Sequence, residues 1–196
     1  MTKKKTVVTT RINILEQKLN IPLEYNRLLI EEAYKIGDKQ AKTSNVKATM
    51  SDWEIFQHTK VFNPLLKNIM KACATFFTPE GNDPNNWVLH EAWTAIYKKG
   101  EYAKEHHHLP SVVSFTYYMQ SDGYTPLCFS RNQHKVFPTN DTLIAFPSFI
   151  SHSVPKHNTP TDRVVLAGNI NWGQKVENYI PSNDNIFNKF DFNAKD

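Results

Sequence analysis

Cysteine is scarce in this chain, whose 196 residues include only Cys73 and Cys128. Two cysteines cannot form the set of disulfides that stabilises a small secreted domain, which excludes a disulfide scaffold. Cys73 falls on the apolar side of an expected helix and Cys128 within an expected strand, so we interpret both as buried free thiols. The sequence thus indicates an intracellular protein, located in the cytoplasm, or in the host cytoplasm if the protein is viral.

Long apolar runs are also missing. No segment has the roughly 20 consecutive apolar residues that a membrane-spanning helix needs, and residues 6–10 are too few and too polar for the core of a signal peptide. The sequence contains neither an internal repeat nor a low-complexity linker. Hydrophobic residues still make up 40% of the chain and aromatic residues 12%, which favours one globular domain over 1–196.

Strong charge is the third absence. The formal net charge is +4, and part of it comes from Lys3, Lys4 and Lys5, which we interpret as a solvated tail. No basic stripe follows in the second half of the chain, so we do not expect a nucleic-acid partner.

Helical patterns dominate residues 1–85. A first helix over 22–36 is expected to begin at Pro22, because proline is well tolerated at the start of a helix. The segment 38–60 is polar and irregular, and Trp53 is its candidate anchor to the core.

A second helix begins at Asn63-Pro64 and ends before Pro79 and Gly81. Its apolar residues follow the spacing of one helix face without a break: Phe62, Leu65, Leu66, Ile69, Met70, Cys73, Phe76 and Phe77. We expect this helix to pack across the outer face of a sheet.

Short apolar runs separated by turn signals replace the helical pattern from Trp87 onward. These runs are 87–97, 112–119, 125–130, 135–137, 142–147 and 163–172. Many short strands at this spacing indicate an antiparallel sandwich or a small barrel, and Asp122-Gly123 is typical of a hairpin turn. We therefore expect a mainly β fold with flanking N-terminal helices, in which 86–173 forms a jelly-roll core and 174–196 a wrapping tail.

Three of the eight histidines are consecutive. Alternate residues of a strand share a face, so His106 and His108 would point one way and His107 the other. Two imidazoles on one face hold a metal when a third ligand comes from elsewhere. His152, which follows the apolar strand at 142–147, is the candidate third ligand. The alternative is a surface histidine cluster that binds metal adventitiously.

Arg163 begins the apolar run 163–172. If this run is a strand, Arg163 shares a face with Asn169 and lies opposite the apolar set that includes Leu166 and Ile170. Its guanidinium would then lie inside the barrel, where a charge is costly unless an anion meets it. A dicarboxylate ligand would supply that anion with bidentate geometry.

The residues after the histidines continue the same alternation. Ser114, Thr116 and Tyr118 share the parity of the two outer histidines, provided that Pro110 causes no bulge. Tyr118 would then lie on the metal side, where its hydroxyl would hydrogen-bond the same anion. The two small polar side chains would leave room for a ligand.

Taken in order, these residues resemble the iron(II)- and 2-oxoglutarate-dependent oxygenases. The matching pattern covers roughly residues 87–172, and it is similar to the prolyl-4-hydroxylase-like branch, especially its small bacterial and phage members. It consists of Tyr97-x-x-Gly100, His106-x-His108, Tyr117-Tyr118, His152 after Phe-Pro-Ser, and Arg163. The resemblance implies a double-stranded β-helix, the jelly roll that cupins share, flanked by helices.

The resemblance implies a role for each matching residue. His106 and His152 correspond to the two histidine ligands of iron, and Arg163 to the basic residue that pairs with the distal carboxylate of 2-oxoglutarate. Tyr118 and Tyr97 correspond to positions that contact 2-oxoglutarate. The implied cofactors are Fe(II) and 2-oxoglutarate, with O₂ as a further substrate, and no catalytic side chain is implied beyond the metal site.

His108 departs from the family, which usually has Asp or Glu at this position. An imidazole in place of a carboxylate raises the net charge at iron by one unit. Three arrangements remain open: His108 is the third ligand, a carboxylate such as Glu105 takes its place, or only two histidines bind and the site is completed by water or is degenerate.

The activity that the resemblance implies is that of a dioxygenase of the hydroxylase kind. Oxidation of 2-oxoglutarate to succinate and CO₂ would be coupled to hydroxylation of an unidentified peptide or small molecule. A second hypothesis is a cupin-like metalloenzyme that uses three histidines without 2-oxoglutarate, in which Arg163 would hold the carboxylate of the substrate itself. A third is a non-catalytic jelly-roll protein, a binding or structural module with a relict metal site.

Overall fold

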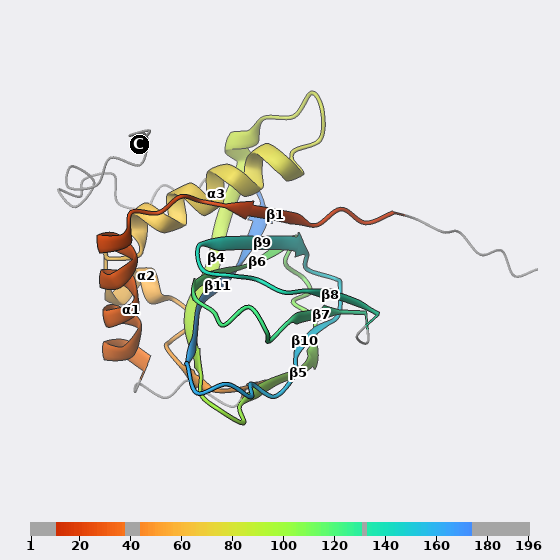
Figure 1. The fold of residues 1–196 in the computed structure, drawn as a ribbon. Coiled ribbons are helices and arrows are strands. Elements are labelled where there is room, and N and C mark those ends of the chain that lie inside the picture. Colours follow the sequence, from red (N-terminus) through yellow and green to blue (C-terminus); the bar gives the residue numbers. More distant parts are fainter. Residues whose placement is uncertain (1–10, 38–43, 131–132, 174–196) are drawn as a thin grey trace, which may run out of the picture.

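Two antiparallel β-sheets face each other in the computed structural model, which describes residues 11–37, 44–130 and 133–173 (Figure 1). The larger sheet has the strand order β1-β9-β6-β11-β4-β3. Its strands are β1 (Leu15–Lys18), β3 (Thr49–Met50), β4 (Trp87–Tyr97), β6 (Val113–Gln120), β9 (Thr142–Pro147) and β11 (Arg163–Trp172).

The smaller sheet has the order β2-β5-β10-β7-β8 and covers the inner face of the larger one. Its strands are short: β2 (Val46–Lys47), β5 (Tyr102–His106), β7 (Leu127–Phe129), β8 (His134–Val136) and β10 (His152–Val154). Two packed antiparallel sheets with helices from the N-terminal part confirm the predicted fold class, a mainly β jelly roll.

Strand β11 forms the centre of the larger sheet. It pairs with β4 from Arg163, opposite Tyr97, to Trp172, opposite Trp87, and with β6 along its other edge. These three strands are buried on both faces, which explains their nearly continuous apolar sequences. The strands predicted at 87–97, 142–147 and 163–172 are confirmed with the same bounds.

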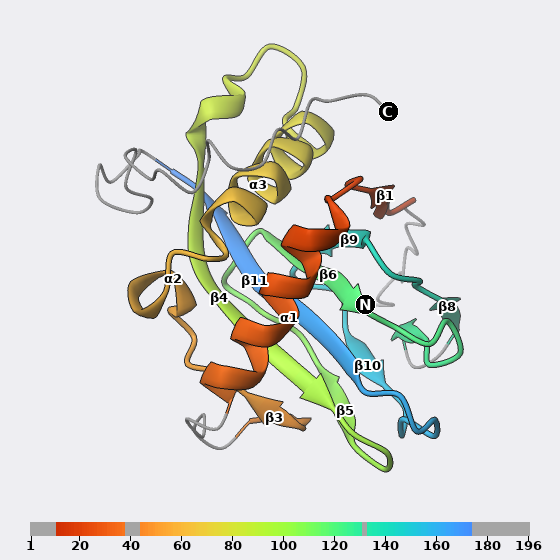
Figure 2. The ribbon, with the colours of Figure 1, turned by 60° about the vertical axis from the view of Figure 1, so that its left-hand side comes forward.

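Helices α1 (Leu23–Gly37) and α3 (Asn63–Phe77) cover the outer face of the larger sheet (Figure 2). Leu29 of α1 and Leu66 of α3 join Leu166 of β11 in one apolar core. Complete burial of a leucine side chain stabilises a fold by about 1.5–3 kcal/mol. The two predicted helices and the packing of the second on the sheet are therefore confirmed.

Between the two helices, the described part of the irregular segment holds the short strands β2 and β3 and the one-turn helix α2 (Ile55–His58). Trp53 packs edge-on against Trp93 of β4, with ring centroids 4.6 Å apart. The predicted anchoring role of Trp53 is confirmed. A short 3₁₀ turn, η1 (Pro84–Asn86), leads into β4.

The hairpin predicted at Asp122-Gly123 is wrong. Strands β6 and β7 on either side of this turn belong to different sheets, and β7 pairs with β10 and β8 instead. Oδ1 of Asp122 accepts hydrogen bonds from the N–H groups of Tyr124 and Thr125, and Gly123 has a φ of +73°. These local contacts form a turn but do not determine which strands pair, so the chain crosses from one sheet to the other.

The three consecutive histidines do not lie in one strand, which also differs from the prediction. Strand β5 ends at His106, and residues 107–112 form a turn that contains Pro110. His152 is the first residue of β10, where it lies directly opposite His106 in the sheet. Pairing of β5 with β10 therefore brings these two histidines together.

A β-bulge in β4 changes which residues face the inside of the sandwich. The register between β11 and β4 shifts just after Asn169, which lies opposite Glu91, and His90 is the extra residue. Gly168 is required here because a Cβ at this position would lie 2.5 Å from the carbonyl oxygen of Glu91 and 2.6 Å from the Phe115 ring. The bulge places Glu91 beside Asn169 at one end of the inner face.

Both cysteines are buried free thiols, as predicted. Among the described residues, no helix has the length and apolar character needed to cross a membrane. The predicted wrapping tail, 174–196, and the lysines at the N-terminus lie outside the described residues.

Candidate metal centre and anion site

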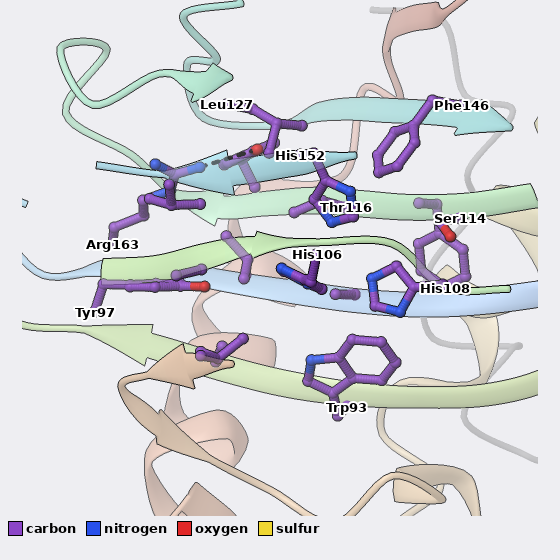
Figure 3. A pocket seen from close by; sticks show the side chains of 18 residues that line it. Trp93, Tyr97, His106, His108, Ser114, Thr116, Leu127, Phe146, His152 and Arg163 are labelled. Atoms are coloured by element: carbon purple, nitrogen blue, oxygen red, sulfur yellow. Dashed lines mark hydrogen bonds between the residues drawn. The ribbon is translucent and has the colours of Figure 1, made fainter. Parts of the chain in front are cut away.

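Three histidine side chains converge between the two sheets (Figure 3). The ring centroid of His152 lies 4.4 Å from that of His106 and 5.1 Å from that of His108, and the latter two are 4.9 Å apart. One nitrogen of each ring lies within 4.8 Å of its counterparts in the other two. This donor set fits a metal ion bound by three imidazoles.

Hydrogen bonds orient two of the rings. Nδ1 of His106 lies 2.6 Å from the carbonyl oxygen of Lys104, and Nδ1 of His152 lies 3.1 Å from that of Ile150. A carbonyl oxygen only accepts, so each Nδ1 carries a proton and donates it, and the lone pair of the neutral ring is on Nε2. Both rings are therefore held in the tautomer that binds a metal through Nε2.

His108 has a different kind of partner. Its Nδ1 lies 3.3 Å from Nδ2 of Asn169. The amide of Asn169 is oriented by its other contacts, because Nδ2 donates to Glu91 at 2.5 Å and Oδ1 accepts from the hydroxyl of Ser114 at 2.7 Å. Nδ1 of a neutral His108 therefore accepts a hydrogen bond, and its proton lies on Nε2. Metal binding through Nε2 requires the other tautomer and a movement of the Asn169 amide.

The surroundings keep the three imidazoles neutral. Burial, together with repulsion from the neighbouring histidines, lowers the pKa of His152 to about 3 and that of His108 to about 4. Burial also lowers the pKa of His106, although the hydrogen bond to Lys104 opposes this effect. Neutral imidazole is the form that binds metals, so at neutral pH none of the three rings has to lose a proton before the cluster binds a metal ion.

A buried arginine lies in the same cavity. Arg163 is 1% exposed, and its Nη1 and Nη2 donate to the carbonyl oxygen of Thr125 and the hydroxyl of Tyr118, each at 3.0 Å. Within the described residues no carboxylate pairs with this guanidinium, and its Nε has no hydrogen-bond partner. A buried guanidinium without a counter-charge is costly, and this arrangement fits an anionic ligand.

Two tyrosine rings flank this guanidinium. Cζ of Arg163 lies 4.9 Å from the ring centroid of Tyr118 and 5.6 Å from that of Tyr97, distances at which cation–π attraction offsets part of the cost of the buried charge. Burial raises the pKa of both phenols, and the guanidinium opposes the rise. Both hydroxyls therefore keep their protons at neutral pH and are available as donors.

One enclosed cavity joins the two groups. In Figure 3, Arg163 lies beside Tyr97 on one side of His106 and His152, and His108 lies near Trp93 on the other side. The cavity between the sheets has a volume of about 40 Å³, which is room for a few water molecules. His108 also lines a wider cavity of about 550 Å³ that opens to solvent next to Glu91. His108 thus borders both the enclosed cavity and the one that opens to solvent.

All six predicted site residues line the enclosed cavity: His106, His108, His152, Arg163, Tyr118 and Tyr97. Ser114 and Thr116 line it too, so the predicted alternation holds on both sides of the turn at Pro110. Glu105 and His107 are exposed, and neither belongs to the histidine group.

His157 is the residue that sequence reasoning missed. The pattern around it indicates an ordinary loop position, yet the side chain is completely buried. Its Nδ1 lies 2.8 Å from the hydroxyl of Thr125, and its Nε2 lies 2.6 Å from the carbonyl oxygen of Thr161. Neither periodicity nor a motif marks this histidine, because its partners come from turns far apart in the chain.

Comparison of the sequence alone identifies no relatives: no family model matches it, and no curated protein sequence is significantly similar to it.

Comparison of the structure identifies several similar proteins. The viral collagen prolyl hydroxylase of Paramecium Bursaria Chlorella virus-1, solved as a 2-oxoglutarate complex, superposes with a TM-score of 0.61 at 13% identity, over 80% of this chain and 94% of that one. A prolyl-4-hydroxylase of Pseudomonas putida gives 0.58 at 16% identity, over 83% and 93%. HygX of Streptomyces hygroscopicus, solved with nickel and 2-oxoglutarate bound, gives 0.61 at 10% identity, over 82% and 83%.

At sequence identities this low, the superpositions establish a common fold and nothing more. The chain therefore has the fold of two prolyl hydroxylases and of a protein that was solved with nickel and 2-oxoglutarate.

Proposed function

We propose that this protein is an iron(II)- and 2-oxoglutarate-dependent oxygenase that hydroxylates a substrate and releases succinate and CO₂. The observation that carries the proposal is the content of one cavity, where three neutral imidazoles share the space with a buried arginine that has no counter-charge among the described residues. The common fold with two prolyl hydroxylases supports the same reaction class.

His106, His108 and His152 are the residues that would hold the iron. Three imidazoles carry no charge, so they leave the full +2 charge of the metal to be neutralised by other ligands. A doubly charged 2-oxo acid is suited to this task. His108 is the weakest of the three, because its Nδ1 faces the N–H of an amide, whereas the other two face carbonyl oxygens.

Arg163 would hold the distal carboxylate of 2-oxoglutarate, assisted by the hydroxyls of Tyr118 and Tyr97. The unpartnered Nε and the charge of the buried guanidinium support this role.

When bound, reduced iron and 2-oxoglutarate would supply the activation of O₂ and the oxidation that yields succinate and CO₂. The chain itself contributes orientation and exclusion of water. The carbonyls of Lys104 and Ile150 hold the two imidazoles of β5 and β10. Apolar Phe146 and Leu127 line the enclosed cavity and limit the entry of bulk water.

The substrate would approach through the wide cavity outside His108. Its lining includes the carboxylates of Asp52, Glu54 and Glu91 and contains no lysine or arginine among the described residues. This charge disfavours the phosphate backbone of nucleic acids, in agreement with the sequence. A peptide or a small molecule fits this route better.

The two alternative functions make different predictions. A three-histidine metalloenzyme that does not use 2-oxoglutarate would bind iron but would not need Arg163 for binding of this acid. A relict site would bind neither component tightly.

Binding titrations without O₂ test the proposal. We expect wild-type protein to bind Fe(II) and then 2-oxoglutarate. His106→Ala and His152→Ala are each expected to weaken Fe(II) binding by on the order of 100-fold, whereas the exposed His107→Ala leaves it unchanged. Arg163→Met is expected to weaken binding of 2-oxoglutarate by roughly 30-fold or more, because it removes the partner of a buried carboxylate. The exposed Arg27→Met is the matched control.

Unchanged iron affinity in both histidine variants would show that the metal site is wrongly assigned. Unchanged affinity for 2-oxoglutarate in Arg163→Met, with the metal still bound, would instead favour the three-histidine metalloenzyme.

A further inference from the structure

A buried histidine–carboxylate pair lies near Arg163 and has no part in the proposed reaction. His157 is completely buried, the Asp122 side chain is 6% exposed, and Nδ1 of His157 lies 3.6 Å from Oδ2 of Asp122. Because Nε2 of His157 faces the carbonyl oxygen of Thr161, it carries a proton, and Nδ1 lies 2.8 Å from the hydroxyl of Thr125, which also lies 3.3 Å from Oδ2 of Asp122. The ring therefore links the loop before β11 to the turn between β6 and β7.

Asp122 holds the same turn from the other side. Its Oδ1 accepts from the N–H groups of Tyr124 and Thr125 at 2.9 and 3.0 Å, and its Oδ2 accepts from the hydroxyl of Thr159 at 2.7 Å. Burial alone would raise the pKa of this carboxyl, but these hydrogen bonds outweigh burial and lower its pKa to about 2. At neutral pH Asp122 is thus an ionised acceptor that ties the two segments together.

The main chain of His157 joins a third turn to this group. The N–H of Gly100 donates to the carbonyl oxygen of His157 at 2.7 Å, and the N–H of His157 donates to the carbonyl oxygen of Glu101 at 2.8 Å. This turn connects β4, which ends at Tyr97, to β5. Three turns of the sandwich are therefore fixed to one another around His157.

Thr125 connects this group to the arginine. Its hydroxyl and N–H are held by His157 and Asp122, and its carbonyl oxygen accepts from Nη1 of Arg163. The only other hydrogen bond of the guanidinium within the described residues is to Tyr118. The direction of the guanidinium in the cavity therefore depends on where Thr125 is held.

We propose that His157 and Asp122 are positioning residues for an anion site at Arg163. They hold the carbonyl of Thr125, which in turn directs the guanidinium toward the distal carboxylate of a bound dicarboxylate. This inference rests on the proposed function, in which 2-oxoglutarate is that dicarboxylate. Neither residue lines the enclosed cavity, so their effect would pass through Thr125 and Arg163.

The test compares two ligands of the Fe(II)-loaded protein without O₂. Pyruvate has the 2-oxo acid group of 2-oxoglutarate but lacks the distal carboxylate, so only 2-oxoglutarate reports on Arg163. His157→Ala and Asp122→Ala are expected to reduce the preference for 2-oxoglutarate over pyruvate by on the order of tenfold while the affinities for pyruvate and Fe(II) stay unchanged. His157→Gln, whose amide both donates and accepts, is expected to keep most of the preference.

The matched controls are His134→Ala and Asp83→Ala. His134 is an exposed histidine of β8, and Asp83 accepts a hydrogen bond from the N–H of Asn85 in the same kind of turn. Both should leave the preference intact. If His157→Ala does not fold, Thr125→Val removes the hydroxyl that contacts His157 and Asp122, keeps the main chain of residue 125, and provides the same comparison.

A preference equal to that of wild type in the variants, or a parallel loss of affinity for both acids, would overturn the positioning role. If the wild-type protein itself binds both acids equally, the assignment of 2-oxoglutarate to Arg163 is wrong, and the positioning role is overturned with it.

Discussion

Among the three histidines of the candidate site, His108 differs from the other two in the hydrogen-bond partner of its Nδ1. Its Nδ1 faces the amide N–H of Asn169, which also donates to Glu91, whereas the Nδ1 atoms of His106 and His152 face carbonyl oxygens. An N–H donor next to the side chain at this position suits a carboxylate better than a metal-bound imidazole.

Replacement of His108 by a carboxylate is therefore expected to improve the site. His108→Asp adds a negative charge and an acceptor for Asn169, and we predict that it tightens Fe(II) binding by about tenfold or more. His108→Asn, which has the same shape without the charge, is the control. Equal or weaker binding by His108→Asp in an anaerobic titration would mean that the imidazole is the better ligand.

The pH dependence of metal binding follows from the low pKa values of the ligands. In the fold the pKa of His108 is about 4 and that of His152 about 3, below the ordinary value of 6.5, so both rings stay unprotonated as the pH falls through 6.5. We predict nearly constant affinity for Fe(II) from about pH 8 to pH 6 and a steep loss toward pH 4. Anaerobic titrations across this range provide the measurement. A steady loss that begins near pH 7 would indicate an exposed histidine cluster.

The elements of the fold differ in how well the sequence predicts them. Strands β4, β9 and β11 are each a continuous apolar run, and their bounds follow from the sequence because burial on both faces requires that composition. The helix face from Leu65 to Cys73 is equally clear.

Strand pairing was harder to predict. Short strands such as β5 and β10 carry little periodicity, and the turn at Asp122 contains no information on which sheet β7 joins. Partners across the chain decide these features, as they also decide the burial of His157. The residues that line the cavity could still be predicted, because their chemical types and order are specific even where the pairing is not.

The close contact at Gly168 makes β11 sensitive to one added methyl group. Gly168→Ala would bring its Cβ against the backbone of Glu91 and the ring of Phe115, so we predict a loss of about 1–3 kcal/mol in the free energy of unfolding. Gly173→Ala meets no atom within 4 Å and is the control. Denaturant unfolding measures both, and equal stability of the two variants would contradict the described packing of β11 against β4.

For the molecule as a whole, the central feature is that the candidate metal centre and the candidate anion site share one enclosed cavity between the sheets. At one side of the cavity lie the three neutral imidazoles, and at the other lies a guanidinium with no counter-charge among the described residues. Once the imidazoles hold a metal ion, a dicarboxylate that spans the cavity would meet positive charge at both ends. Binding of the metal and of 2-oxoglutarate should therefore be coupled.

We predict that Fe(II) increases the affinity for 2-oxoglutarate by at least about tenfold and that 2-oxoglutarate increases the affinity for Fe(II) by the same factor, as linkage requires. Calorimetric titrations of each component, with and without the other, provide the measurement. Affinities that are independent of each other would place the two ligands at separate sites.

The most direct test of the proposed function is the formation of succinate from 2-oxoglutarate by the wild-type protein in the presence of Fe(II) and O₂. We predict succinate that depends on both, at a rate that His152→Ala abolishes and His107→Ala preserves. If protein that has demonstrably bound iron and 2-oxoglutarate returns the 2-oxoglutarate unchanged when O₂ is admitted, the protein is not the oxygenase proposed here.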